Sequence, residues 1–115
     1  MLYKISDFAD ITGLTKETLR YYADIKLLEP AYIDPNNNYR YYDDGSYFLA
    51  ILLIKLKRLG FTIQEMTSVM KDESFANLEE LLLQKRRKIQ SQIDDLYLRM
   101  EEMDAFLESG KEENE

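Results

Sequence analysis

The chain has 115 residues, of which 45% are hydrophobic and 32% charged, and its net charge at pH 7 is −7. The absence of cysteine excludes disulfides and thiolate metal sites, and without histidine the commonest catalytic base is missing too, so we expect no enzyme and no cofactor. No window holds the roughly 18 continuous apolar residues of a transmembrane helix. The N-terminus also lacks a secretory signal, so we expect a cytoplasmic protein without a membrane partner.

The acidic balance of the whole chain argues against nucleic acid as a partner, because DNA repels negative charge. Many of the acids, however, lie in the last third of the sequence, including the tail over 111–115. Charges are screened within about 8–10 Å in physiological salt, so the local field on one surface decides whether phosphate binds. The acidic balance therefore does not exclude a DNA-binding protein.

Two short helices are predicted near the N-terminus. Ser6 is a suitable N-cap for a first helix over 7–12, which Gly13 stops, and Thr15 is a suitable N-cap for a second helix over 16–24. Two short helices joined by a tight turn with a glycine indicate a helix-turn-helix. Its small core is predicted to contain Ile11, Leu14, Leu19 and Tyr22.

A β-hairpin is predicted over residues 31–42. Tyr32-Ile33 and the run over 39–42 are rich in aromatic and branched strand formers, and the intervening 34–38 (DPNNN) is typical of a turn. Such a hairpin after a helix-turn-helix would be the wing of a winged helix.

Two further helices are predicted after the wing. Asp43 or Asp44 caps the first, which runs to Leu59 and stops at Gly60. The run over 62–65 (TIQE) matches the capping box that begins a short helix, which ends near Met70.

A long helix is predicted from about Asn77 to about Leu107, with Gly110 past its end. From Ile89 onward its apolar residues recur at alternating steps of four and three, which is a heptad pattern. A lone helix cannot bury such a stripe, so we expect a second chain to pair with it. The apolar stripe, called the seam below, contains Leu82, Ile89, Ile93, Leu96, Met100, Met103 and Leu107.

The predicted architecture is mainly α: a winged helix-turn-helix with a small β-hairpin wing, followed by a long C-terminal coiled-coil helix. We expect the winged domain over 1–72, the dimerisation helix over 75–109 and an acidic tail over 110–115.

The helix over 16–24 is the best candidate for entry into the major groove of DNA. The alternative is an ordinary exposed basic helix with its tyrosines in the core, and the spacing alone weighs the two about equally. The side chains that would face bases and phosphates are Thr15, Lys16, Thr18, Arg20, Tyr21 and Tyr22.

Three other basic segments have competing interpretations. Tyr39, Arg40 and Tyr41 would meet the DNA backbone from the wing, or would stabilise the hairpin by packing, and the alternation along the strand suggests both. Lys57 and Arg58 would belong to a second wing, although a solvated helix face is the more common role of such a cluster. The run over 85–88 (KRRK) is typical of a nucleic-acid patch. It lies on the pairing helix, however, which favours charges that face solvent or acidic residues of the partner, and Arg86 could set the register.

The order of these segments resembles the MerR family of bacterial transcriptional regulators over roughly residues 2–70. The residues that carry the resemblance are Tyr3-Lys4-Ile5, Gly13-Leu14-Thr15, Thr18-Leu19-Arg20-Tyr21-Tyr22, Leu27-Leu28-Glu29-Pro30, Tyr39-Arg40-Tyr41-Tyr42 and Leu59-Gly60-Phe61-Thr62-Ile63-Gln64-Glu65. Asp34-Pro35 before Tyr39-Arg40-Tyr41-Tyr42 is similar to the multidrug-sensing branch.

The resemblance implies a homodimer, paired through an antiparallel coiled coil, that binds a pseudo-palindromic promoter. It also implies that the dimer distorts the spacer DNA so that RNA polymerase can use the promoter. Two positions depart from the family: Lys26 and Asn38 stand where glycine is usual. The sensor cysteines and the large C-terminal domain of family branches are missing from this sequence, so the chain is either part of a longer regulator or a short member.

Two other functions remain compatible with the residues. One is an excisionase-like accessory that bends DNA without regulating a promoter, and the other is a coiled-coil interaction module that does not bind DNA. The long heptad helix favours a regulator over an accessory, because a fixed distance between two recognition helices requires a dimer.

Overall fold

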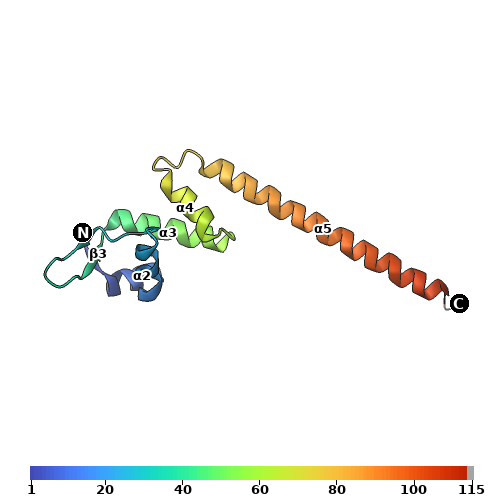
Figure 1. Cartoon of the computed structure of the whole chain (residues 1–115), viewed down its shortest axis with the longest axis horizontal. Helices are drawn as coiled ribbons and strands as arrows, with labels where there is room; N and C mark the ends of the chain where they lie inside the picture. The colour runs from blue at the N-terminus through green and yellow to red at the C-terminus, as the bar shows by residue number, and fades with distance from the viewer. Residues whose placement is uncertain (114–115) are drawn as a thin grey trace. The chain divides into compact units, whose positions relative to one another are not determined.

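The computed structural model describes residues 1–113 and contains two compact units, Met1–Glu73 and Ser74–Glu115. We call the first the winged unit; the second consists mainly of one long helix (Figure 1). The elements of the described residues are, in chain order, β1 (Tyr3–Lys4), α1 (Ile5–Thr12), α2 (Lys16–Asp24), β2 (Tyr32–Ile33), β3 (Arg40–Tyr42), α3 (Asp44–Arg58), α4 (Ile63–Lys71) and α5 (Leu78–Glu113). No helix among them is long and apolar enough to cross a membrane.

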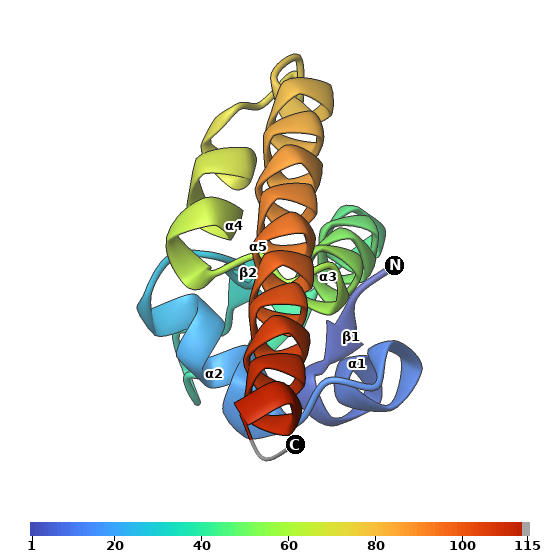
Figure 2. The ribbon, with the colours of Figure 1, turned by 90° about the vertical axis from the view of Figure 1, so that its right-hand side faces the viewer.

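The helix-turn-helix forms where it was predicted, with one correction at its start. Gly13 ends α1 in the left-handed conformation, with φ of 82°, and Thr15 caps α2 by accepting a hydrogen bond from the Thr18 N–H at 3.0 Å. Ser6, however, is not the N-cap of α1. Strand β1 runs directly into this helix (Figure 2), so Lys4 occupies the cap position, without a side-chain cap within the described chain.

The predicted hairpin is confirmed as β2 and β3, and β1 adds a third strand that the sequence did not suggest. The sheet order is β1-β3-β2 and both pairings are antiparallel, with Tyr3 opposite Tyr42 and Tyr32 opposite Tyr41. Asn38 closes the hairpin turn at φ 59°, a conformation that asparagine tolerates better than most residues.

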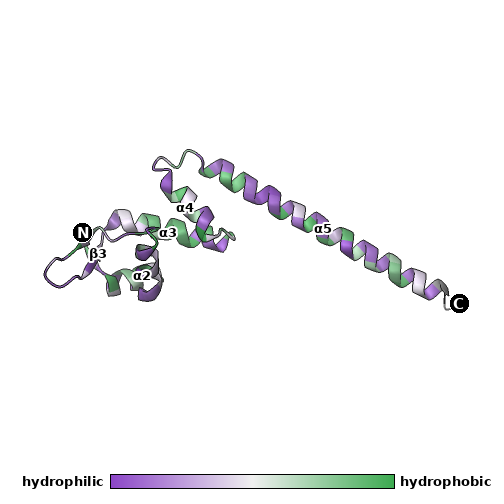
Figure 3. Cartoon of the chain, in the orientation of Figure 1, coloured by the Kyte–Doolittle hydropathy of each residue, from purple (hydrophilic) through white to green (hydrophobic). Residues whose placement is uncertain are grey.

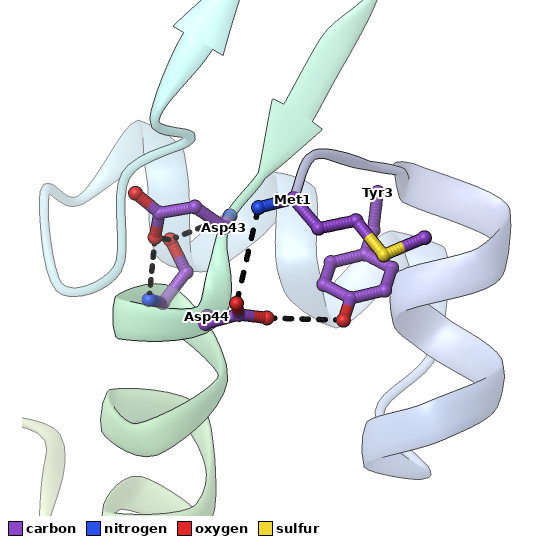
Figure 4. Close-up of polar contacts among 5 residues, drawn as sticks. Met1, Tyr3, Asp43 and Asp44 are labelled. Carbon is purple, nitrogen blue, oxygen red and sulfur yellow. Dashed lines mark hydrogen bonds and ion pairs between the residues drawn. The ribbon is translucent and has the colours of Figure 1, made fainter.

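The start of α3 joins the N-terminus to the rest of the winged unit. Asp43 is the N-cap and accepts the Ser46 N–H at 2.8 Å, which lowers the pKa of the Asp43 carboxyl. Asp44 points to the N-terminal strand instead (Figure 4), where it accepts the Tyr3 hydroxyl at 3.0 Å and lies 3.8 Å from the Met1 ammonium group. Both acids suggested by the sequence therefore stabilise this corner, and Asp43 alone caps the helix.

Two helices of the winged unit end in the same motif, built from different residues. In α3 the Phe61 N–H donates to the Leu56 carbonyl at 3.0 Å, and Gly60 adopts a φ of 87°. In α2 the Leu27 N–H donates to the Tyr22 carbonyl at 2.8 Å, and Lys26 adopts a φ of 59°. Both are Schellman ends, and the one at Lys26 places a side chain in the conformation that favours glycine.

The core of the winged unit lies between the sheet and α1, α2 and α3. Phe8 of α1 stacks on Tyr42 of β3, with ring centroids 4.4 Å apart and planes 8° from parallel. Leu19 and Tyr22 are buried as predicted, whereas Leu14 is half-buried and Ile11 is 45% exposed, so Ile11 does not belong to the core. Helix α4 begins with the predicted capping box, in which Thr62 and Glu65 exchange hydrogen bonds.

Helix α5 is longer than expected. It continues through Gly110 to Glu113, beyond the predicted end near Leu107. Part of the predicted acidic tail is therefore helical, and its residues 114–115 lie outside the described residues. Polar and apolar residues alternate along the whole helix (Figure 3), and the seam from Ile89 to Leu107 is 41–63% exposed within the single chain. Only Leu82, at the start of the seam, is half-buried.

Candidate nucleic-acid interface

Helix α2 separates an inward apolar face from an outward polar one. Leu19 is fully buried, while Lys16, Arg20 and Tyr21 are exposed. Lys16 and Arg20 are four residues apart, so they lie on the same helix face. Thr15 and Thr18, joined by a hydroxyl–hydroxyl hydrogen bond of 2.9 Å, lie at the start of that helix. The helix therefore exposes two cations on one face and a phenol beside them, with the two hydroxyls at its N-terminal end.

Tyr22 does not share that surface. It was predicted both as a core residue and as a DNA contact, and it is only 3% exposed. Burial raises the pKa of its hydroxyl, consistent with a ring that packs in the interior. Tyr22 lies three residues after Leu19, so both side chains lie on the buried face of α2. Tyr22 is therefore not a candidate DNA contact.

The strand β3 divides its side chains between two faces. Tyr41 packs against Tyr32 of the neighbouring strand, with ring centroids 6.0 Å apart, so the predicted cross-strand packing is present. Tyr39, just before the strand, is 59% exposed. Arg40 shares the face of Tyr42, which points to the helices, and the guanidinium nitrogen Nη1 of Arg40 is buried without a hydrogen-bond partner in the described residues.

A pocket of about 350 Å³ collects the charges of three elements, and we call it the basic pocket. Its charged lining residues are all cations in the described part of the chain: Lys4 before α1, Arg20 of α2 and Arg40 of β3. Ser6 and Asn38 add polar groups. Three cations around one hollow attract an anion such as a phosphate group. Sequence reasoning identified Arg20 and Arg40 but missed Lys4, because only the pairing of β1 with β3 brings it there.

Lys57 and Arg58 lie in the last turn of α3, where they complement the negative end of the helix dipole. The residues 59–62 that follow form a compact turn that contains the Schellman end. Within the described residues no strand pair lies between α3 and α4. The segment predicted as a second wing is therefore this turn. A second pocket, of about 400 Å³, joins Lys57 and Arg58 to Thr12 and Gly13 at the end of α1.

The charge of the chain is distributed unevenly between the two units. In residues 1–73 nine Lys and Arg stand against 11 Asp and Glu, a net charge of −2, whereas residues 74–115 have six against 11, a net charge of −5. Most of the acidic excess is therefore outside the unit that contains the basic pocket. The described residues contain no cluster of acids that could hold a metal ion.

A protein-family model described as "MerR HTH family regulatory protein" matches residues 3–73. Among curated relatives, the Multidrug-efflux transporter 1 regulator of Bacillus subtilis (strain 168) is 32% identical over 94 residues, which are 82% of this chain and 34% of that protein. The HTH-type transcriptional regulator CueR of the same organism is 31% identical over 80 residues, which are 68% of this chain and 54% of that protein. The chain thus spans about a third to a half of these relatives.

Solved structures with the same fold include two complexes with DNA. The cryo-EM structure of an EcmrR–DNA complex in EcmrR-RPo matches 98% of this chain and 41% of that chain, with a TM-score of 0.73 and 34% identity. The fold is also that of HiNmlR, described as a MerR family regulator lacking the sensor domain and bound to promoter DNA, with a TM-score of 0.63, 23% identity and coverage of 88% of this chain and 80% of that chain.

Proposed function

Because the chain belongs to the MerR family of helix-turn-helix regulatory proteins, we propose that it is a sequence-specific DNA-binding transcriptional regulator that acts as a homodimer. The observation that carries the proposal is the composition of one surface. Helix α2 buries Leu19 and Tyr22 and exposes Lys16 and Arg20, and the basic pocket extends that surface toward the wing.

The two parts of this surface have different tasks. Lys16, Arg20 and Tyr21, with the hydroxyls of Thr15 and Thr18, contact base edges and phosphates in the major groove. The wing residues Tyr39, Arg40 and Tyr41 contact the sugar-phosphate backbone, which fixes the position of α2 but does not read sequence. Lys57 and Arg58 add phosphate contacts beside the end of α1.

The homodimer forms through α5. The dimerisation residues are those of the seam: Leu82, Ile89, Ile93, Leu96, Met100, Met103 and Leu107. A 36-residue helix whose apolar stripe is exposed from Ile89 to Leu107 requires a partner, and a second copy provides an identical stripe. Two winged units held at a fixed distance then read two half-sites of a pseudo-palindromic promoter.

Regulation follows from distortion of the DNA between the half-sites. The dimer bends and untwists the promoter spacer, and RNA polymerase then uses the realigned promoter, which places the protein in the cytoplasm with the DNA. The energy of such a deformation depends on the spacer sequence, so positions that the protein does not touch contribute to specificity.

Selection of bound duplexes from a random pool tests the proposal. We expect enrichment of two inverted half-sites at one fixed separation. A parallel selection with Arg20→Ala serves as the control and should lose the enriched sequence. Absence of enrichment in the unaltered chain would contradict DNA recognition, and a single half-site would contradict the dimeric reading.

A further inference from the structure

Helix α5 carries two charged residues at the edge of its apolar seam. Arg86 and Asp104 are 18 residues apart, which is about five turns at 3.6 residues per turn, so both lie on the same side of the helix. In the heptad pattern Asp104 occupies the position next to the seam residue Met103. Both are exposed, and neither has an ion pair or a side-chain hydrogen bond within the part of the chain that the structure describes. By contrast, Arg87 pairs with Glu80 at 3.0 Å within the same helix.

The position of Arg86 is unusual for a charge. It lies seven residues before Ile93, which is one heptad, so it occupies the same edge of the seam as Ile93 and Met100. A charge in such a position loses water when a partner helix covers the seam, and it requires a counter-charge to offset that cost. A single polar residue in an apolar seam fixes the register of a coiled coil for this reason.

The seam itself selects a register. When a second α5 lies antiparallel so that Leu82 meets the partner's Leu107, the same register brings Ile89 opposite the partner's Met100 and Ile93 opposite the partner's Leu96. All seven residues of the seam then lie opposite one another or opposite Arg86. In a parallel pair without stagger, Arg86 would instead face its own copy, and so would Asp104, which is repulsive at both places.

We propose that Arg86 forms an ion pair with the partner's Asp104 at both ends of an antiparallel α5 dimer, and that these two pairs select the orientation and register. In the register above, Arg86 and the partner's Asp104 lie within one residue of the same height. The two antiparallel helices are related by a two-fold axis. The side of the seam that carries Arg86 and Asp104 in one helix therefore lies next to the same side of the partner helix. This inference rests on the homodimer of the proposed function and names the residues that determine it.

The surrounding charges act in the same direction. The N-terminal half of α5 contains the basic run Lys85–Lys88, and the C-terminal half contains Glu101, Glu102, Asp104 and Glu108. The N-terminal half as a whole is neutral, because Glu79, Glu80, Asp94 and Asp95 balance the four cations. The antiparallel register nevertheless places the run 85–88 at the height of the partner's residues 101–104, whereas a parallel pair without stagger places each run beside its own copy. The other charges of these segments lie outside the seam, and surface ion pairs are worth little individually, so the selective contribution comes from Arg86 and Asp104.

A charge swap in the full chain tests the proposal. Sedimentation equilibrium measures the dimer dissociation constant of the unaltered chain, Arg86→Glu, Asp104→Arg and the double variant. We expect each single variant to weaken the dimer at least about tenfold, and the double variant to recover to within about threefold of the unaltered chain. Lys88→Glu is the matched control, because it makes the same charge change roughly 200° further round the helix than Arg86.

The outcomes separate this inference from the one it rests on. If the unaltered chain is dimeric but Arg86→Glu weakens it no more than Lys88→Glu does, the ion pair is wrong and the homodimer stands. Failure of the double variant to recover affinity would equally overturn the pair. If the unaltered chain is monomeric at micromolar concentration, the homodimer itself is wrong.

Discussion

The winged unit and α5 bury their apolar side chains by different routes. In the winged unit Phe8, Leu19 and Tyr42 are fully buried by elements of the same chain. In α5 the seam residue Leu96 is 55% exposed and Leu107 is 63% exposed. The winged unit thus has a core complete within one chain, whereas on the proposed homodimer α5 depends on association with a second copy. The stability of α5 should therefore vary with protein concentration, whereas the stability of the winged unit should not.

The substitution with the largest expected effect is Leu96→Glu, which removes the partner of α5 and leaves the winged unit intact. A carboxylate in the middle of the seam would lose its water in both copies, and the effective penalty for an unpaired buried ion is several kcal/mol. We expect a monomer by sedimentation at micromolar concentration, with the circular dichroism of the winged unit retained. Leu98→Glu is the control, because Leu98 lies roughly 200° round the helix from Leu96. A Leu96→Glu protein that remains a dimer would show that the seam is misplaced.

Arg20→Ala is the converse change, since it alters the exposed face of α2 and leaves α5 untouched. Loss of a base or phosphate contact from this helix should weaken binding to the selected duplex by about 1–3 kcal/mol. The dimer constant and the thermal unfolding curve should not change. Lys71→Ala removes the same charge from α4 and should bind DNA normally. Equal affinity of Arg20→Ala and the unaltered chain would refute the assignment.

A smaller and less selective effect is expected at the wing. Arg40→Ala removes a guanidinium that lines the basic pocket and that we assign to a phosphate contact. Affinity should fall about equally for selected and unrelated duplexes, and the slope of log affinity against log salt should fall in magnitude by roughly 1. An unchanged slope would mean that Arg40 stabilises the hairpin only.

The smallest expected effect is a gain in stability at the end of α2. Lys26 adopts the left-handed conformation, at φ 59°, that Gly60 adopts at the equivalent end of α3. Lys26→Gly should therefore stabilise the winged unit by about 0.5–1 kcal/mol, after the greater flexibility of glycine in the unfolded chain is counted. Lys55→Gly, in the helical backbone of α3, should destabilise it by a similar amount. Denaturant titration measures both, and a loss of stability in Lys26→Gly would contradict the account.

Local chemistry explains which features the sequence could predict. The caps at Thr15 and Thr62 and the stop at Gly60 depend on residues within a few positions of each other, so they were predicted correctly. The left-handed turns at Lys26 and Asn38 were indicated instead by the family resemblance, because both residues stand where glycine is usual.

Non-local pairing explains the errors in the winged unit. A two-residue strand such as β1 has no periodicity to detect, and its pairing with β3 moves Lys4 into the basic pocket and displaces Ser6 from the cap. The stack of Phe8 on Tyr42 joins residues far apart in the sequence, and it occupies the interior that Ile11 was expected to fill. The helix end was placed too early because Gly110 costs only about 1 kcal/mol inside a helix, which does not terminate α5.

Hydrogen exchange at two protein concentrations tests the difference between the two units most directly. The amides of α3 belong to a core complete within one chain, so their protection should be the same in a concentrated sample and in one diluted below the dimer dissociation constant. The amides around Ile93 and Leu96 in α5 should lose protection on dilution, because the helix then loses its partner. Protection of α5 that stays constant across that dilution would show that its seam does not depend on a second copy.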